Sequence, residues 1–158
     1  MVKERPKGLD SPGTRRVIRA LSKANVAVYR ASRGRVGARF RLGAGFRRPV
    51  PVCLLTTTGR KTGLARTCPL LFLADGDRVV LVASQGGLPT DPLWFRNLVA
   101  EPAVTVQIGG SVRAMRARVA DPAERVELWP RLTALYTDFD DYAAWTERVI
   151  PVVVCDPA

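Results

Sequence analysis

The segment LLTTTGRKTG, residues 54–63, combines the side chains of this sequence that are best suited to bind an anion. Two glycines free its backbone, its threonines offer hydroxyl groups, and Arg60, Lys61 and the nearby Arg66 carry positive charge. Each charge-assisted contact to a phosphate or carboxylate contributes on the order of 1.5–3 kcal/mol. Three such contacts would hold a multiply charged tail with micromolar or better affinity. Composition alone favours the alternative, a basic hairpin turn that is exposed to solvent and binds no ligand.

The same segment does not have the pattern of a phosphate-binding P-loop. The motif G-x-x-x-x-G-K-[ST] could end at Lys61 and Thr62, but its two glycine positions are then Leu55 and Arg60. A strand is expected after the turn, so no helix N-terminus would face the anion. The sequence therefore predicts a basic strand-turn-strand corner.

The content of histidine and cysteine excludes several classes of enzyme. The chain has no histidine, and Cys53, Cys68 and Cys155 lack any CxxC spacing. Histidine-based triads and most zinc or non-haem iron sites are therefore excluded, and we expect no metal. Three cysteines beside apolar residues predict buried free thiols in a reducing compartment.

The size and hydropathy of the chain predict one cytoplasmic domain. Its 158 residues suit a single core. No segment approaches the ~20 apolar residues of a spanning helix, and residues 1–14 lack the apolar region of a signal peptide.

Positive charge is concentrated near the N-terminus. Residues 1–48 carry fourteen Lys or Arg and two acidic residues, whereas residues 49–158 carry eleven basic and twelve acidic residues. Residues 15–30 predict a basic amphipathic helix. Its apolar arc contains Val17, Ile18, Leu21, Ala24, Asn25, Val28 and Tyr29. Two interpretations of this helix stay open. It packs on the domain with its basic face in solvent, or it lies on the anionic surface at the inner face of the cell membrane. Nucleic acid is not expected as a partner, because residues 1–48 have no aromatic cluster for base stacking.

The remaining periodicity predicts an antiparallel barrel of the α+β class. We expect residues 1–30 to form a flexible basic arm and the amphipathic helix, residues 31–48 a basic loop, and residues 49–158 the folded domain. The predicted strands cover residues 51–57, 66–74, 78–84, 103–108, 112–119 and 149–155. The predicted helices cover residues 92–100, 122–136 and 139–148, with Asp91 and Asp121 as caps of the first two. The apolar run of residues 78–84 predicts a strand buried on both faces.

Several segments together identify a family. In order and spacing, TTTGRKTG, CPLLFLADGDR, VASQGGLPTDPLWFRNL, EPAVTVQI and LWPRLTALYTDFDDYAAWTERVIPVVVC resemble the deazaflavin-dependent nitroreductase family, which uses coenzyme F420. The resemblance runs from about residue 29 to residue 157. It implies a split β-barrel related to flavin-binding reductases. It also implies a bound deazaflavin whose phosphate and oligoglutamate tail extends across the basic corner.

The same resemblance assigns roles to individual residues. The cofactor-binding residues would be Arg60, Lys61, Thr62, Arg66, Pro69, Ser84, Trp94 and Asn97. Tyr136 and Tyr142 would flank the substrate pocket, and Ser84 and Tyr136 would assist catalysis. Trp94, Tyr136 and Tyr142 also have helical spacings that would equally serve a core.

Three positions depart from the family pattern. Gln85 stands where a lysine commonly follows the serine, Leu71 replaces a strand tyrosine, and Phe139 replaces the middle tyrosine of the helix trio. Phe139 has no hydroxyl to orient a substrate or donate a proton, so Tyr136 or Ser84 would have to assist.

The resemblance implies an F420H2-dependent reductase that transfers a hydride to a quinone, nitroaromatic or similar electron-poor acceptor. Menaquinone is a candidate acceptor if the basic helix docks at a membrane. Two alternatives stay open: a non-catalytic carrier of deazaflavin, flavin or tetrapyrrole, and FMN in place of F420.

Overall fold

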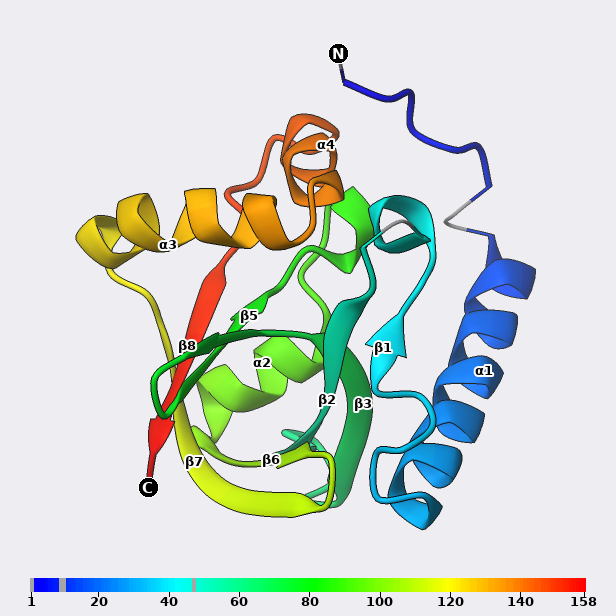
Figure 1. Cartoon of the computed structure of the whole chain (residues 1–158). Helices are drawn as coiled ribbons and strands as arrows, with labels where there is room; N and C mark the ends of the chain where they lie inside the picture. The colour runs from blue at the N-terminus through cyan, green and yellow to red at the C-terminus, as the bar shows by residue number, and fades with distance from the viewer. Residues whose placement is uncertain (1, 9–10, 47) are drawn as a thin grey trace.

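A curled antiparallel sheet forms the centre of the structure, a computed structural model that describes residues 2–8, 11–46 and 48–158 (Figure 1). The strands of the described residues are β1 (Arg39–Phe40), β2 (Val50–Thr58), β3 (Ala65–Leu71), β4 (Leu73–Asp75), β5 (Arg78–Val82), β6 (Ala103–Ile108), β7 (Ser111–Val119) and β8 (Val152–Pro157). The helices are α1 (Pro12–Ala31), α2 (Leu93–Ala100), α3 (Pro122–Leu135) and α4 (Asp138–Ala144), with short 3-10 turns η1 (Gly43–Phe46) and η2 (Gln85–Gly87). The predicted α+β class and antiparallel barrel are confirmed, with β1 and β4 in addition to the six expected strands.

The sheet curls because β3 and β4 are two parts of one bent segment. The strand order is β1-β2-β6-β7-β8-β5-β4, and β3 pairs with β2. Leu54 of β2 lies opposite Pro69 of β3 on one side and Gln107 of β6 on the other. Only Phe72 separates β3 from β4, and its amide donates to the Pro51 carbonyl at 3.2 Å. Since β3 pairs with β2 and β4 pairs with β5, this bend brings the two ends of the sheet together.

Alternate strand residues fill the inside of the barrel and cover its outside. In β5, Val79 and Leu81 belong to the inner core, to which α2 also contributes. Val80 and Val82 belong to an outer core covered by α3 and α4. The prediction that this strand is buried on both faces is therefore confirmed.

The three cysteines differ in burial. Cys53 and Cys155 are free and fully buried in the inner core, as predicted. Cys68 is free but only partly buried.

The ends of the helices differ in part from the sequence-based expectation. Asp121 caps α3 as predicted, since its carboxylate accepts from the Glu124 amide at 2.9 Å. The expected cap at Asp91 is wrong, because Pro92 is the N-cap residue of α2 and Asp91 binds Arg148 instead. The last helix is shorter than predicted and ends at Ala144.

The predicted N-terminal arm and basic loop contain more structure than expected. Within residues 31–48, β1 pairs with the start of β2, and η1 follows it; residue 47 lies outside the described residues. In the arm, residues 1, 9 and 10 also lie outside the described residues. Lys3 contacts α4, since its ammonium lies 2.5 Å from Asp138 and its carbonyl accepts from the Trp145 indole at 2.6 Å.

Helix α1 confirms the predicted amphipathic helix and is anchored at its C-terminal end. Tyr29 is fully buried; its hydroxyl donates to the Val52 carbonyl at 3.0 Å and accepts from the Gly109 amide at 2.9 Å. Val26 packs in the same small core, and Arg30 donates to the Thr67 hydroxyl at 2.9 Å. These contacts fix the rotation of the helix about its own axis.

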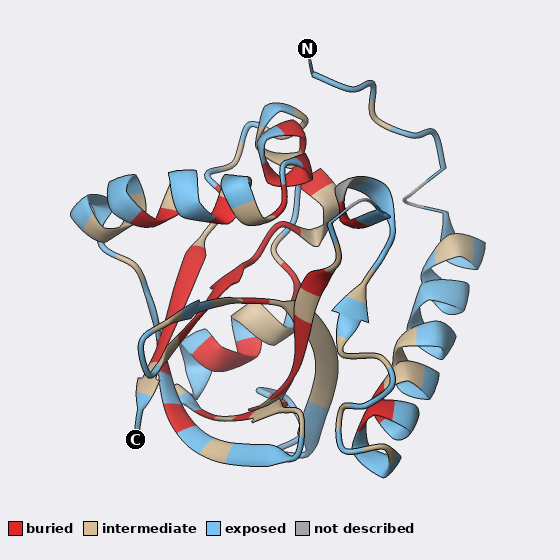
Figure 2. Cartoon of the chain, in the orientation of Figure 1, coloured by how far each residue is buried: buried red, intermediate tan, exposed pale blue. Residues whose placement is uncertain are grey.

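The apolar arc of α1 does not pack on the domain as one surface. Val17 is 58% exposed, Leu21 is 65% exposed and Val28 is also exposed, so most of α1 is coloured as exposed in Figure 2. The expected packing of this arc therefore fails for these positions, because only the edge of the arc that contains Tyr29 packs on the barrel. Among the described helices, none combines the length and hydropathy needed to cross a bilayer.

Candidate functional site

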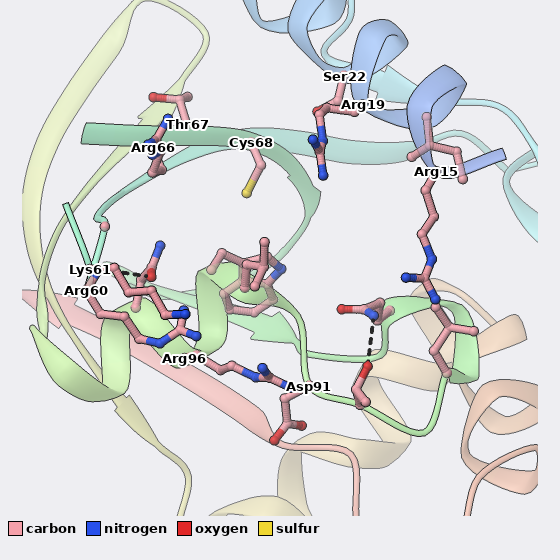
Figure 3. A pocket seen from close by; sticks show the side chains of 18 of the residues that line it. Arg15, Arg19, Ser22, Arg60, Lys61, Arg66, Thr67, Cys68, Asp91 and Arg96 are labelled. Carbon is pink, nitrogen blue, oxygen red and sulfur yellow. Dashed lines mark hydrogen bonds between the residues drawn. The ribbon is translucent and has the colours of Figure 1, made fainter. Parts of the chain in front are cut away.

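A groove of about 1110 Å³ lies between α1, β3 and α2 (Figure 3). Helix α1 contributes Arg15, Ile18, Arg19, Ser22 and Lys23 to its lining, and the β2–β3 turn contributes residues 59–62. The other lining residues are 66–68 of β3, Gln85, Gly86, Leu88, Thr90 and Asp91 of the loop after β5, and Leu93, Trp94, Arg96 and Asn97 of α2.

The groove is strongly cationic. Of the described residues that line it, seven are basic, namely Arg15, Arg19, Lys23, Arg60, Lys61, Arg66 and Arg96. Asp91 is the one acidic residue among them, and it lies 2.9 Å from Arg148. None of the seven cations forms an ion pair within the described part of the chain. Their charge is therefore available to an anionic ligand.

The β2–β3 turn holds its cations on a closed backbone. The Gly59 amide donates to the Leu64 carbonyl at 2.8 Å, and the Gly63 amide donates to the Gly59 carbonyl at 2.7 Å. Gly63 has a φ of 69°, which favours glycine at this position. Arg60 and Lys61 lie at the exposed tip of this turn.

Asn97 ties the turn to α2. This buried side chain accepts from the Arg60 amide at 3.2 Å and donates to the Thr57 hydroxyl at 3.2 Å. A buried amide that bridges two elements in this way fixes their distance, because neither contact can be lost without leaving a polar group unpaired. Asn97 therefore positions the basic corner relative to Trp94, one turn earlier on the same helix.

Arg148 holds the loop that forms another wall of the groove. Its side chain is only 15% exposed and donates to the carbonyls of Ala83 (3.1 Å), Ser84 (2.9 Å) and Leu88 (2.8 Å). A further nitrogen donates to Asp91 at 2.9 Å. Four contacts from one planar guanidinium fix both ends of the loop.

The loop itself has a backbone that needs such support. Gln85, Gly86 and Gly87 all have positive φ, at 47°, 63° and 75°. A Cβ on Gly87 would lie 2.9 Å from the Tyr142 carbonyl oxygen, so α4 packs directly against the loop. A positive φ is unfavourable in free energy for a residue with a side chain such as Gln85. This conformation persists because the contacts of Arg148 and α4 hold the loop in place.

The groove lining also contains apolar side chains. Trp94 packs edge-on against Phe95, with ring centroids 6.3 Å apart, and Ile18 of α1 also lines the groove. Burial raises the pKa of the Cys68 thiol to about 12, so it is neutral near pH 7 and cannot act as a thiolate nucleophile.

Over the described residues, no group of three or more Cys, Asp or Glu side chains is arranged to hold a metal ion.

A sequence profile described as F420H(2)-dependent quinone reductase matches residues 21–157. The chain belongs to this family. A Mycobacterium tuberculosis protein whose name places it among F420H(2)-dependent quinone reductases is 48% identical over 117 residues, covering 74% of this chain and 98% of the relative. A second M. tuberculosis protein, named F420H(2)-dependent quinone reductase, is 37% identical over 131 residues, covering 81% of this chain and 84% of that protein.

A solved structure of an F420-H2 dependent reductase has the same fold. It superimposes with a TM-score of 0.63 at 36% identity, covering 67% of this chain and 94% of that chain. The predicted family and the predicted split barrel are therefore confirmed.

The groove of this F420H(2)-dependent quinone reductase family member brings together six of the sequence-predicted site residues. They are Arg60, Lys61, Thr62, Arg66, Trp94 and Asn97. Pro69 lies one residue beyond the groove lining on β3, and Ser84 lies one residue before it, 8% exposed.

Tyr136 and Tyr142 lie in an aromatic cluster and do not line the groove. Their hydroxyl oxygens are 3.2 Å apart, and Phe139 packs against both rings. Burial, together with the Tyr142 contact, raises the pKa of Tyr136, so its phenol is protonated near pH 7. The Tyr142 backbone and the ring of Trp145, which packs against the Tyr142 ring, lie close to Gly87, so this end of α4 supports the η2 loop.

Sequence reasoning missed several groove residues. The sequence predicted a basic helix face that contains Arg15, Arg19 and Lys23, but it did not show which part of the domain this face points to. The packing of Tyr29 on the barrel turns these side chains toward the groove. Arg96 shares α2 with Asn97, so its position on a helix beside a basic corner was the signal available for it.

The chemistry of these walls fits coenzyme F420, as the family implies. A planar ring needs apolar contacts, which Trp94 and Ile18 can supply. A phosphate and carboxylates need cations, which line the groove on α1, the β2–β3 turn, β3 and α2.

Proposed function

We propose that this chain transfers a hydride from reduced coenzyme F420 to a quinone and that the groove holds the cofactor. The observation that carries the proposal is the convergence of seven unpaired cations on one groove that also has an apolar wall. The groove volume of about 1110 Å³ leaves room for a cofactor larger than most small ligands, whose sites measure about 300–1,000 Å³.

In this proposal the corner binds the anionic part of the cofactor. Arg60, Lys61 and Arg66 contact the phosphate and carboxylates, and the Thr62 hydroxyl donates a further hydrogen bond. Trp94 contacts the ring, while Pro69 shapes the β3 wall beside it. Asn97 acts through the turn that it holds.

When bound, reduced F420 supplies a hydride from C5 of its deazaflavin ring, and the quinone takes up this hydride and one proton to become a hydroquinone. The residues of the chain orient the two molecules, and holding them in contact lowers the barrier. The proton comes from solvent or from a nearby hydroxyl, for which Ser84 and Tyr136 are the candidates. Ser84 lies next to the groove residue Gln85, and its carbonyl accepts from Arg148. The Tyr142 backbone supports the loop at Gly87.

The test is the oxidation of reduced F420, followed by its visible absorbance, after addition of menadione. We expect the full chain to accelerate this oxidation well above the rate in buffer, with saturation in both substrates. Tight binding of F420 without acceleration would instead identify a carrier, and the proposed reaction would be wrong.

We further propose that α1 docks the protein on an anionic membrane, where a lipid-soluble quinone such as menaquinone is dissolved. Val17, Leu21 and Val28 form an exposed apolar stripe at spacings of four and seven residues. Its apolar side chains favour the interface of a bilayer, and the net charge of +11 of the chain favours an anionic one.

Co-sedimentation with phosphatidylglycerol vesicles tests the membrane proposal. We expect the variant Val17→Gln/Leu21→Gln to bind about tenfold more weakly than the unaltered chain, because it loses two apolar side chains from the interface. The control Val126→Gln/Val149→Gln changes two valines that are each 76% exposed elsewhere, and it should bind normally. Equal sedimentation of all three proteins would exclude docking through α1.

A further inference from the structure

Helix α1 presents a row of cations to the groove. Arg15, Arg19 and Lys23 recur every four residues and all line the groove, with Ile18 and Ser22 between them. At a rise of about 1.5 Å per residue, this row extends over roughly 12 Å. Figure 3 shows Arg15 and Arg19 reaching from α1 into the groove, on the side away from Arg60 and Lys61.

The direction of this row is fixed by the packing of the helix. At about 100° per residue, Arg15 and Arg19 fall within roughly 20° of the buried Val26. The hydrogen bonds of Tyr29 and the contact of Arg30 with Thr67 hold that side toward the barrel. The row is therefore part of the groove, and it cannot turn to solvent without the loss of this anchor.

The two cationic walls repel one another when the groove holds no anion. Neither the corner nor the α1 row is neutralised by a carboxylate of the described residues. An extended chain of carboxylates between the walls would relieve this repulsion and gain contacts with both. A single phosphate cannot contact all of a row that extends over roughly 12 Å.

We infer that α1 is a second anion-binding wall, which holds the distal carboxylates of the cofactor's oligoglutamate tail. This inference rests on the proposed function and adds a dependence on tail length. The corner binds the phosphate and the first carboxylates, and Arg15, Arg19 and Lys23 bind those farther along. Affinity then increases with each added glutamate until the α1 row is filled.

Fluorescence titration with deazaflavin cofactors of different tail length tests the inference. The probes are F420 with several glutamates and the same deazaflavin phosphate without glutamates. For the unaltered chain we expect a gain of about two- to fivefold in affinity for each of the first glutamates at low salt, as for exposed ion pairs.

The variant Arg15→Gln/Arg19→Gln/Lys23→Gln should lose the part of this gain that comes from the distal glutamates and keep the part that the corner provides, so its affinity rises less with tail length than that of the unaltered chain. The control Arg16→Gln/Arg35→Gln/Arg41→Gln removes the same charge from exposed positions outside the groove lining and should keep the gain. Equal affinity of all three proteins for the glutamate-free probe will show that the groove is intact.

Two results would overturn the inference. If the α1 variant keeps the full dependence on tail length, the tail does not contact α1, while the proposed function stands. If the unaltered chain binds neither probe, the proposed function fails and the inference fails with it.

Discussion

Replacing Arg148 by alanine is expected to lower the free energy of unfolding by about 2–4 kcal/mol and to weaken F420 binding at least tenfold. Three backbone carbonyls and Asp91 lose their donor, and all of these contacts lie in the loop that lines the groove. The positive φ of Gln85 then lacks its support, so the loop samples conformations that do not bind the cofactor. Urea unfolding and F420 titration measure the two effects.

Two further variants make the prediction specific to the role of the guanidinium. Arg148→Lys keeps the charge but cannot reach four acceptors with one ammonium group, so its stability should be intermediate. Arg131→Ala removes an exposed arginine with one ion pair to Asp75 at 3.0 Å and should change stability by less than about 1 kcal/mol. If Arg148→Ala and Arg131→Ala behave alike, Arg148 does not hold the loop.

The barrel was predictable because its strands are short segments rich in apolar and β-branched residues and bounded by turn residues. The bend at Phe72 was not predictable from that pattern. Residues 66–74 are apolar enough for one strand, and the break depends on a hydrogen bond to Pro51, twenty-one residues earlier. Local periodicity contains no information about such a contact.

The direction of α1 was also beyond the sequence pattern. The hydrophobic arc of residues 15–30 indicated which side is apolar, but the side that faces the barrel is set by the buried hydroxyl of Tyr29. Its partners, Val52 and Gly109, are distant in sequence. The same limit explains Asp91, whose capping role was predicted locally and was overridden by Arg148.

The basic corner was the part of the site that the sequence predicted best, since its residues are adjacent in the chain. Arg60, Lys61 and Thr62 need only one turn to act together, and Asn97 was named through the family resemblance. The supporting contacts of the groove join segments that are about sixty residues apart, and no motif marks them.

The double variant Arg60→Gln/Lys61→Gln is expected to lose about 100-fold or more of the affinity for F420, since it removes two charge-assisted contacts to the anionic tail. Both side chains are exposed at the tip of the turn, so stability should not change. Because these contacts are exposed, the affinity of the unaltered chain should also fall as salt is added. The control Arg35→Gln/Arg41→Gln has the same net charge as the variant and should bind F420 normally.

The most direct measurement is a fluorescence titration of the unaltered chain and of Arg60→Gln/Lys61→Gln with F420, with FMN titrated in parallel. The account predicts micromolar or tighter F420 binding by the unaltered chain, weaker FMN binding, and a large loss of F420 affinity in the variant. Undiminished F420 affinity in the variant, or tighter binding of FMN than of F420 by the unaltered chain, would contradict it.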